Sequence, residues 1–330
     1  MTTTPRVRAP ELPQNYPWLN TDRPLSLQKL KGRVVILDFW TYCCINCLHV
    51  LPELKYLEQK YKDSLTVIGV HSAKFETEKE VENIRQAILR YDIEHPVIVD
   101  SGFRVWQSYA VRAWPNLMVI DPEGYVIGYA SDEGNRDALD KLIGELIRQH
   151  QELGTINFQE LSLSLEKQRK PLVTPLAFPG KVLATSAGLF IADSGHHRII
   201  VANTAGEVLH LIGTGTQGLT SGSFTEAQFF APQGMAFDER NQILYVADTE
   251  NHTLRRIDLN SQTVETIAGT GEQSHNIRPH NGAGLEVALN SPWDLEIVGN
   301  RLFIAMAGPH QIWEMQLDTG IIGTYAGTRK

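Results

Sequence analysis

The chain has 330 residues, of which 42% are hydrophobic and 21% charged, and its formal net charge is −8. This composition is typical of a globular protein, and the length leaves room for two domains with a core in each. The sequence has no block of basic residues, which argues against nucleic acid and anionic membrane surfaces as partners.

All three cysteines lie between residues 43 and 47. A secreted protein held together by disulfides spreads its cysteines along the chain, so this clustering favours a reducing compartment with one local thiol site. The N-terminal residues carry no apolar signal segment, and no apolar run is long enough to span a bilayer. We therefore expect a cytoplasmic protein without a membrane partner.

The first strong structural signal runs from Val34 to Cys47 and reads VVILDFWTYCCINC. Its apolar, β-favouring start predicts a buried strand, and the following residues to Lys62 place leucines at helical spacing. Cys44 and Cys47 lie at the junction, where the unpaired N–H groups of a helix N-terminus favour a thiolate. The pattern predicts a strand, a turn that carries thiols, and a helix.

This segment resembles the active site of thioredoxins, in the branch related to the TlpA and AhpC/TSA proteins. The resemblance implies that Cys44 and Cys47 are the redox pair and that Asp38 is the buried aspartate that assists proton transfer from the second cysteine. Cys43 stands where these families usually carry Trp, and Ile45-Asn46 stands where Gly-Pro is usual. The Cys-Cys-Ile-Asn-Cys string is similar to that of thioredoxin-like proteins fused to NHL repeats.

Alternating strand and helix patterns continue to residue 150 and predict an α/β sheet with helices on both faces. Strands are expected at 65–70, 96–100 and 117–121, and helices at 77–91, 103–109 and 136–149. Within this region, Pro115 matches the cis-proline of the thioredoxin fold. The resemblance implies that Trp114 and Pro115 border the groove for an extended substrate. A trans proline that opens a strand is the alternative reading.

The second half contains an internal repeat. The string beginning at Leu189 (LFIADSGHHRI) recurs at Leu244 (LYVADTENHTL) and, in a degraded form, at Leu302 (LFIAMAGPHQI). Gly-Thr pairs at 213–214, 269–270 and 327–328 keep step with it. Short strands separated by glycine turns at this period predict propeller blades, and the pattern resembles NHL repeats.

His197, His252 and His310 occupy the same position in successive repeats. In a propeller they lie on separate sheets, too far apart to share an ion, so we predict no metal site and no cofactor. We expect each ring to bond within its own blade, with Asp193 or Asp248 as an acceptor, because repeated polar groups usually form structural networks.

The predicted fold is an α/β thioredoxin-like domain (1–150), a linker (151–174) and an all-β NHL-repeat propeller (175–330). Alternating leucines at 161, 163 and 165 suggest a propeller strand or a bridging ribbon within the linker. Only three blades are visible, whereas propellers close with about 4–8. We therefore expect an incomplete propeller from a truncated chain, with an open sheet edge and an exposed apolar face that oligomerisation could cover.

The predicted activity is thiol–disulfide exchange on protein substrates by Cys44 and Cys47, with re-reduction by a cellular reductant and a protein partner on the propeller. A non-catalytic scaffold is the alternative of a different class. A thiol peroxidase is weaker, because Leu37 stands where the proline of peroxiredoxins belongs. From residue 175 onward, 9 basic against 15 acidic residues disfavour RNA binding.

Cys43 has three readings: a buried spacer, an alternative disulfide partner, or a peroxide-sensitive thiol and hence a redox accessory. The buried spacer is favoured because free cysteines are usually buried.

Overall fold

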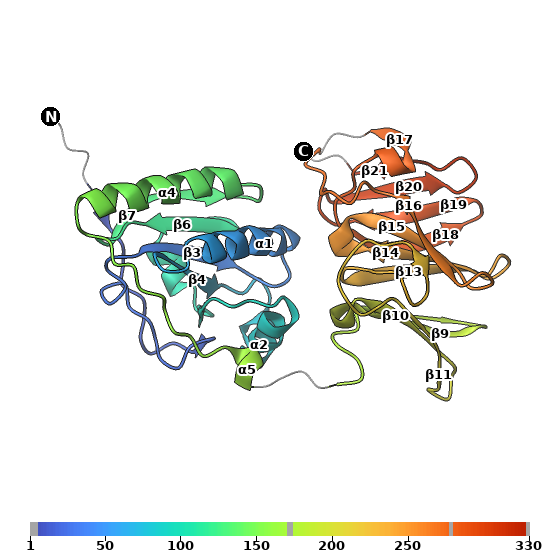
Figure 1. Ribbon diagram of the computed structural model, residues 1–330, viewed down its shortest axis with the longest axis horizontal. Helices are drawn as coiled ribbons and strands as arrows, with labels where there is room; N and C mark the ends of the chain where they lie inside the picture. The colour runs from blue at the N-terminus through green and yellow to red at the C-terminus, as the bar shows by residue number, and fades with distance from the viewer. Residues whose placement is uncertain (1–5, 170–173, 277–279, 328–330) are drawn as a thin grey trace. The chain divides into compact units, whose positions relative to one another are not determined.

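The computed structural model describes residues 6–169, 174–276 and 280–327 (Figure 1). The chain divides into two compact units, Met1–Leu172 and Val173–Lys330. Within the described part of the chain, no helix combines the length and the apolarity needed to cross a bilayer.

The first unit is built on a seven-stranded mixed sheet in the order β1-β7-β6-β3-β4-β5-β2. Strand β3 is central, parallel to β4 and antiparallel to β6, and every residue of β3 and β4 is buried. Burial on both faces explains why these strands read as continuous apolar runs. The strands are β1 (Val7–Arg8), β2 (Trp18–Leu19), β3 (Val34–Trp40), β4 (Leu65–His71), β5 (Val97–Val99), β6 (Asn116–Ile120) and β7 (Tyr125–Ser131).

Helices cover both faces of this sheet, as predicted. One face packs Val34 and Ile36 against α1 and α4, and the other packs Val35 and Leu37 against α3 and the N-terminal segment. The expected helix over 77–91 is divided, because Glu80 has an extended backbone between a 3₁₀ turn and α2. The helices are α1 (Ile45–Lys60), the 3₁₀ turn Glu76–Lys79, α2 (Val81–Arg90), α3 (Arg104–Ser108), α4 (Arg136–Glu152) and α5 (Glu166–Arg169).

The stretch expected to link the domains, 151–174, packs on the first unit as far as Arg169, and residues 170–173 lie outside the described residues. The backbone N–H of Asn157 donates to the carbonyl of Gly32 at 2.7 Å, and that of Gln159 to the carbonyl of Asp63 at 2.9 Å. Leu161 packs on the core of the unit. Leu161 and these backbone bonds therefore anchor an irregular segment to this domain, and no propeller strand forms from the described residues 153–165.

The second unit contains three antiparallel sheets, which Figure 1 shows stacked one after another and which form three blades of a partial propeller. The repeated LFIAD-type segment forms the corresponding strand in each blade: β9 follows β8, β14 follows β13, and β19 follows β18. Blade 1 comprises β8 (Lys181–Thr185), β9 (Gly188–Asp193), β10 (Arg198–Ala202) and β11 (Val208–Ile212). Blade 2 comprises β12 (Gly222–Ser223), β13 (Pro232–Asp238), β14 (Ile243–Asp248), β15 (Thr253–Asp258) and β16 (Thr263–Ala268). Blade 3 comprises β17 (Asn281–Ala283), β18 (Pro292–Val298), β19 (Arg301–Met306), β20 (Gln311–Gln316) and β21 (Ile321–Ala326).

The rings of two of the repeated histidines, His197 and His252, bond to the next blade, whereas we expected bonds within their own blades. The backbone N–H of Ala231, just before β13, donates to Nδ1 of His197 at 3.2 Å. In the same way, the N–H of Ser291, just before β18, donates to Nδ1 of His252 at 3.1 Å. Both histidines have left-handed backbones, in the turns between β9 and β10 and between β14 and β15.

A second contact between blades recurs at the residue that directly follows β9 and β14. The hydroxyl of Ser194 donates to the carbonyl of Pro232 at 2.5 Å, and the hydroxyl of Thr249 donates to the carbonyl of Pro292 at 2.7 Å. Both side chains are buried. These bonds fix each blade to the first strand of the next.

Thr249→Val should destabilise the protein by about 1–2 kcal/mol, because valine keeps the shape but leaves the buried carbonyl of Pro292 without this donor. Urea unfolding followed by tryptophan fluorescence measures the change. Thr263→Val, at an exposed position, is the matched control and should change the free energy of unfolding by no more than about 0.5 kcal/mol. Equal effects of the two substitutions would show that the contact between blades contributes nothing.

Candidate functional site

The candidate site lies where β3 ends and α1 begins. Cys44 is the N-terminal cap residue of α1, with an extended backbone, and the N–H groups of Cys47 and Leu48 donate to its carbonyl at 3.0 and 3.1 Å. Cys43 is exposed, Cys44 half-buried and Cys47 fully buried, and all three are free thiols. The structure therefore brings the predicted redox pair together at the start of a helix.

Cys44 is the acidic thiol of the pair. A hydrogen bond from the Cys47 side chain is the main reason that its pKa is lowered to about 6. The N–H groups of Cys47 and Asn46 and the charge of Lys74 act in the same direction, against the opposing effect of burial. A thiol with this pKa is largely thiolate at neutral pH, which is the form that attacks disulfides.

Cys47 has the opposite character. Burial, followed by the hydrogen bond and the charge of Cys44, raises the pKa of Cys47 well above its ordinary value. One cysteine is thus prepared as a nucleophile and the other as a buried thiol that must lose a proton before it can react.

Asp38 lies in the middle of β3 and is 1% exposed. Burial raises the pKa of its carboxyl group to about 7, and nearby His95, Glu58 and Cys44 modify this value. Neither carboxylate oxygen has a hydrogen-bond partner among the described residues. Its charge also acts on the thiol of Cys47, so its position is compatible with the role that the resemblance implies.

Trp114 and Pro115 form a cis peptide bond, and an aromatic cluster holds the Trp114 ring. The ring centroid of Trp114 lies 4.4 Å from that of Trp106, and its indole N–H donates to the carbonyl of Ser72 at 3.0 Å. Lys74, the cation that acts on the Cys44 thiol, has its amine 5.4 Å from the Trp114 ring centroid. Trp114 is therefore fixed beside a residue that tunes the nucleophile.

Cys43 is exposed, so the favoured reading of this residue as a buried spacer is wrong. It follows the end of β3 in the turn, where a side chain does not face the sheet core. Partial burial, together with a hydrogen bond to Glu78 and the charge of that carboxylate, raises the pKa of Cys43 to about 11. The Cys43 thiol is thus kept protonated beside a thiol that is ionised.

Glu78 is a site residue that the sequence did not indicate. Its carboxylate is 2% exposed and accepts the N–H groups of Cys43, Lys74 and Phe75 at 3.1, 2.8 and 3.1 Å. It therefore ties the turn that carries Cys43 to the segment after β4. Only tertiary structure joins these two segments, so no local pattern marks the residue.

Glu78→Gln should raise the rate of Cys43 alkylation at neutral pH about tenfold, equivalent to one pKa unit, because the nearby negative charge is removed. Mass spectrometry after a brief iodoacetamide pulse reads the three thiols separately. The exposed Glu76→Gln serves as the control and should leave Cys43 unchanged. An unchanged Cys43 in both variants would contradict the role given to Glu78.

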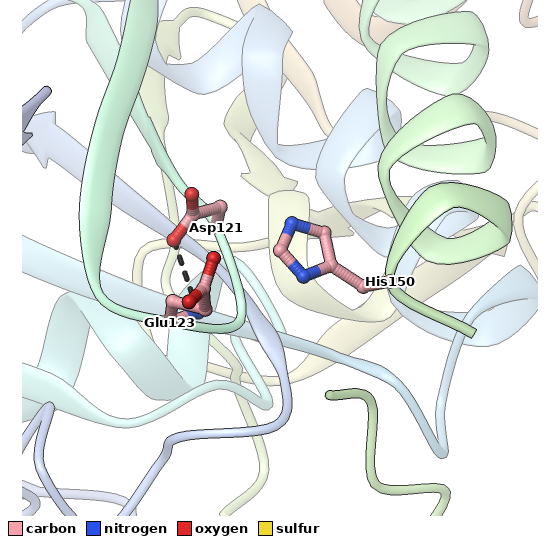
Figure 2. A group of neighbouring side chains, drawn as sticks. All are labelled: Asp121, Glu123 and His150. Atoms are coloured by element: carbon pink, nitrogen blue, oxygen red, sulfur yellow. Dashed lines mark hydrogen bonds between the residues drawn. The ribbon is translucent and has the colours of Figure 1, made fainter. Parts of the chain in front are cut away.

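A cluster elsewhere in the first unit has the composition of a metal site. Figure 2 shows Asp121 and Glu123, from the turn between β6 and β7, close to His150 of α4. It is the one such group found among the described residues. However, Arg6 forms ion pairs with both carboxylates, and Nδ1 of His150 lies 2.7 Å from the Thr155 hydroxyl. The arginine already pairs with both acids and offsets one of their two charges, so we interpret the cluster as a structural ion-pair network.

Buried polar networks also recur in the propeller, at aspartates of the repeat string. Asp248 forms a fully buried ion pair with Arg255 at 2.9 Å and accepts the Phe230 N–H at 2.7 Å. Asp193, which is also buried, pairs with the partly exposed Arg198 at 2.8 Å. These aspartates thus bond to residues of their own blades, whereas His197 and His252 bond to the next blade.

Known proteins are similar to this chain in both the thioredoxin-like domain and the repeat region. Residues 32–126 match a family model described as thioredoxin-like. The chain is 45% identical over 327 residues to Protein SUPPRESSOR OF QUENCHING 1, chloroplastic, of Arabidopsis thaliana, covering 96% of this chain and 31% of that protein. It is 44% identical over 329 residues to NHL repeat-containing protein 2 of Gallus gallus, covering 95% and 44%. The chain thus spans less than half the length of these relatives.

A third relative covers the first unit alone. The thiol-disulfide oxidoreductase YkuV of Bacillus subtilis is 24% identical over 143 residues, covering 43% of this chain and 95% of that protein. Together with the thioredoxin-like fold, this similarity supports a redox-type function. Fold, repeat pattern and relatives agree: the chain is a thioredoxin-like protein fused to NHL repeats.

Proposed function

We propose that this chain is a thiol–disulfide oxidoreductase that uses Cys44 and Cys47. The Cys44 thiolate attacks a substrate disulfide, forms a mixed disulfide and releases one substrate sulfur as a thiolate. The Cys47 thiol loses its proton and displaces the second substrate sulfur, which closes the Cys44–Cys47 disulfide. The substrate gains two electrons and the dithiol loses two, so a cellular reductant must restore the pair.

The observation that carries the proposal is the opposed acidity of the two thiols. The hydrogen bond from the Cys47 side chain, together with the N–H groups at the helix N-terminus, lowers the pKa of half-buried Cys44, whereas burial raises the pKa of Cys47. Thiolate character and partial exposure mark a reactive cysteine, whereas burial alone gives an inert one. Two structural cysteines would not need such a difference.

The proposed substrates are protein disulfides that reach Cys44 past Trp114 and Pro115. We further propose that the blades bind a protein partner. A hollow of about 890 Å³, lined by residues of β8, β13 and β18, offers one concave surface for it. The restriction of all cysteines to residues 43–47 supports a reducing compartment such as the cytoplasm.

A non-catalytic scaffold remains the alternative from another class, and it predicts partner binding without thiol turnover. The peroxidase alternative has less support. The Thr41 hydroxyl lies 4.0 Å from the sulfur of Cys43, and the raised pKa of Cys43 keeps that thiol protonated, whereas attack on a peroxide needs a thiolate.

A thiol-trapping redox titration tests the proposal. The purified protein is equilibrated at a series of potentials set by dithiothreitol and glutathione buffers, alkylated, and read by mass spectrometry at each cysteine. A reversible Cys44–Cys47 couple within the range of cellular oxidoreductases, roughly −120 to −270 mV, is the expected result. Three thiols that stay reduced throughout, or a disulfide through Cys43, would overturn the exchange mechanism.

A further inference from the structure

Beneath α1 the first unit brings together three titratable groups, two of them buried, and disulfide exchange by itself does not require all three. Besides Asp38 of β3, they are His95, which is 3% exposed and precedes β5, and Glu58 of α1. Nδ1 of His95 lies 3.4 Å from the Glu58 carboxylate. Its other ring nitrogen, Nε2, has no hydrogen-bond partner among the described residues, like both oxygens of Asp38.

A glycine makes the close approach of these groups possible. Gly69 of β4 is paired in register with Asp38 of β3, so the two positions are neighbours on one face of the sheet. A Cβ atom at Gly69 would lie 3.3 Å from Nε2 of His95 and 2.9 Å from Nε1 of Trp40. The missing side chain therefore leaves the space beside Asp38 to the His95 ring and the Trp40 indole N–H.

The charges of the three groups are coupled. Burial lowers the pKa of His95, but the charge and hydrogen bond of Glu58, with the charge of Asp38, more than offset this and leave the pKa raised. The charge of His95 in turn opposes the effect of burial on Asp38. A histidine between two carboxyl groups can accept a proton at one ring nitrogen and release one from the other.

The far end of the series reaches solvent. The Glu58 side chain is 27% exposed and borders a surface hollow of about 380 Å³ whose lining also includes Lys55, Lys62 and Glu94. At the other end of the series, the charge of Asp38 acts on the buried thiol of Cys47. One end of this group of side chains thus acts on the buried thiol, and the other end borders solvent.

We propose that Asp38, His95 and Glu58 form a proton path from the Cys47 thiol to solvent. The inference rests on the proposed exchange reaction and concerns its second step. As Cys47 attacks the mixed disulfide, its proton passes to Asp38, then to Nε2 of His95, directly or through water, while the Nδ1 proton passes to Glu58 and out to solvent. The leaving substrate sulfur takes its proton from solvent. In this scheme Asp38 is the base that takes the proton from Cys47. His95 and Glu58 do not contact the reacting sulfur, and they are positioning residues that act through Asp38.

The test separates the two chemical steps. Dithiobis(nitrobenzoate) reacts with the reduced protein in two phases: attack by Cys44 releases the first nitrothiophenolate, and attack by Cys47 releases the second. Nitrothiophenolate leaves without needing a proton, so the second phase reports deprotonation of Cys47. The experiment uses the full chain in a Cys43→Ser background, which removes the third thiol.

We expect His95→Gln to slow the second phase about tenfold, and Glu58→Gln about threefold, with the first phase within twofold of the parent. His95→Gln should also shift the pH midpoint of the second phase upward, because Asp38 loses a positive neighbour while Glu58, Glu94, Cys44 and Cys47 remain. His150→Gln, which replaces a buried histidine far along α4, is the control for histidine loss. A purely structural role for His95 would not move the pH midpoint.

The outcomes separate the inference from the exchange reaction. If the parent shows no second phase, the proposed exchange fails, and the proton path falls with it. If the parent resolves normally and Glu58→Gln and His95→Gln leave the second phase unchanged, the path alone is overturned. Should His95→Gln fail to fold, the partly exposed Glu58 decides: an unchanged second phase in Glu58→Gln overturns the path, and a selective slowing supports it.

Discussion

Cys44→Ser should lower the rate of protein disulfide reduction by about 10³-fold or more, because the serine hydroxyl cannot supply the anion that attacks the disulfide. Stability should change little, within about 1 kcal/mol, since Cys44 is half-buried at a helix cap where serine is well accepted. Turnover with insulin as probe substrate and dithiothreitol as reductant measures the activity. Urea unfolding measures the stability.

Two neighbouring substitutions serve as controls. Cys43→Ser should keep most of the activity, because the Cys43 thiol is protonated at neutral pH. Cys47→Ser should retain the attack but accumulate the mixed disulfide, which mass spectrometry detects. Equal activity in Cys44→Ser and in the parent would refute the exchange mechanism, and unchanged capture of a partner by an inactive protein would favour the scaffold.

Much of the first unit was predictable because its signals are local. The apolar run at Val34 and the leucine spacing after Cys47 predicted β3 and α1, and the position of the thiols followed from the junction. The residues that tune the thiols were not predictable. Lys74 and Glu78 follow β4 and His95 precedes β5, so only the parallel pairing of the strands brings them beneath or beside α1.

Errors arose where a local pattern had more than one tertiary outcome. Free cysteines are usually buried, yet Cys43 lies in a turn outside the sheet and is exposed. The alternation at Leu161 suits a strand, but the neighbouring backbone bonds to Gly32 and Asp63 instead. A pattern of apolar residues predicts that a segment is partly buried, and it does not identify the surface that buries it.

The repeat predicted the blades well because each unit repeats the same strands and turns. It did not predict where the polar groups of the repeat would bond. His197 and His252 reach the next blade, whereas Asp193 and Asp248 bond arginines in their own blades. These partners depend on the twist between adjacent sheets, for which a single repeat contains no information.

Asp38→Asn should stabilise the reduced protein at pH 8 by up to about 4 kcal/mol. In the folded protein burial raises the pKa of Asp38 from 3.8 to about 7. Between these values the folded state keeps a proton that the unfolded state has released, so this group makes stability fall as pH rises through the window. Above about pH 7 the full cost of a buried carboxylate is present, and asparagine removes it.

The measurement is urea unfolding of parent and variant at pH 4, 6 and 8 under reducing conditions, because groups that titrate identically in both proteins cancel in the difference. The stability gained from Asp38→Asn should be small at pH 4 and should grow toward pH 8. The exposed Asp132→Asn is the control for the loss of a carboxylate and should not reproduce this gain. A constant gain for Asp38→Asn would mean that the carboxyl titrates alike in both states, and a loss that grows with pH would mean that the carboxylate has stabilising partners. A stabilised variant that also resolves the mixed disulfide slowly would show that the buried acid is kept for the reaction at the expense of stability.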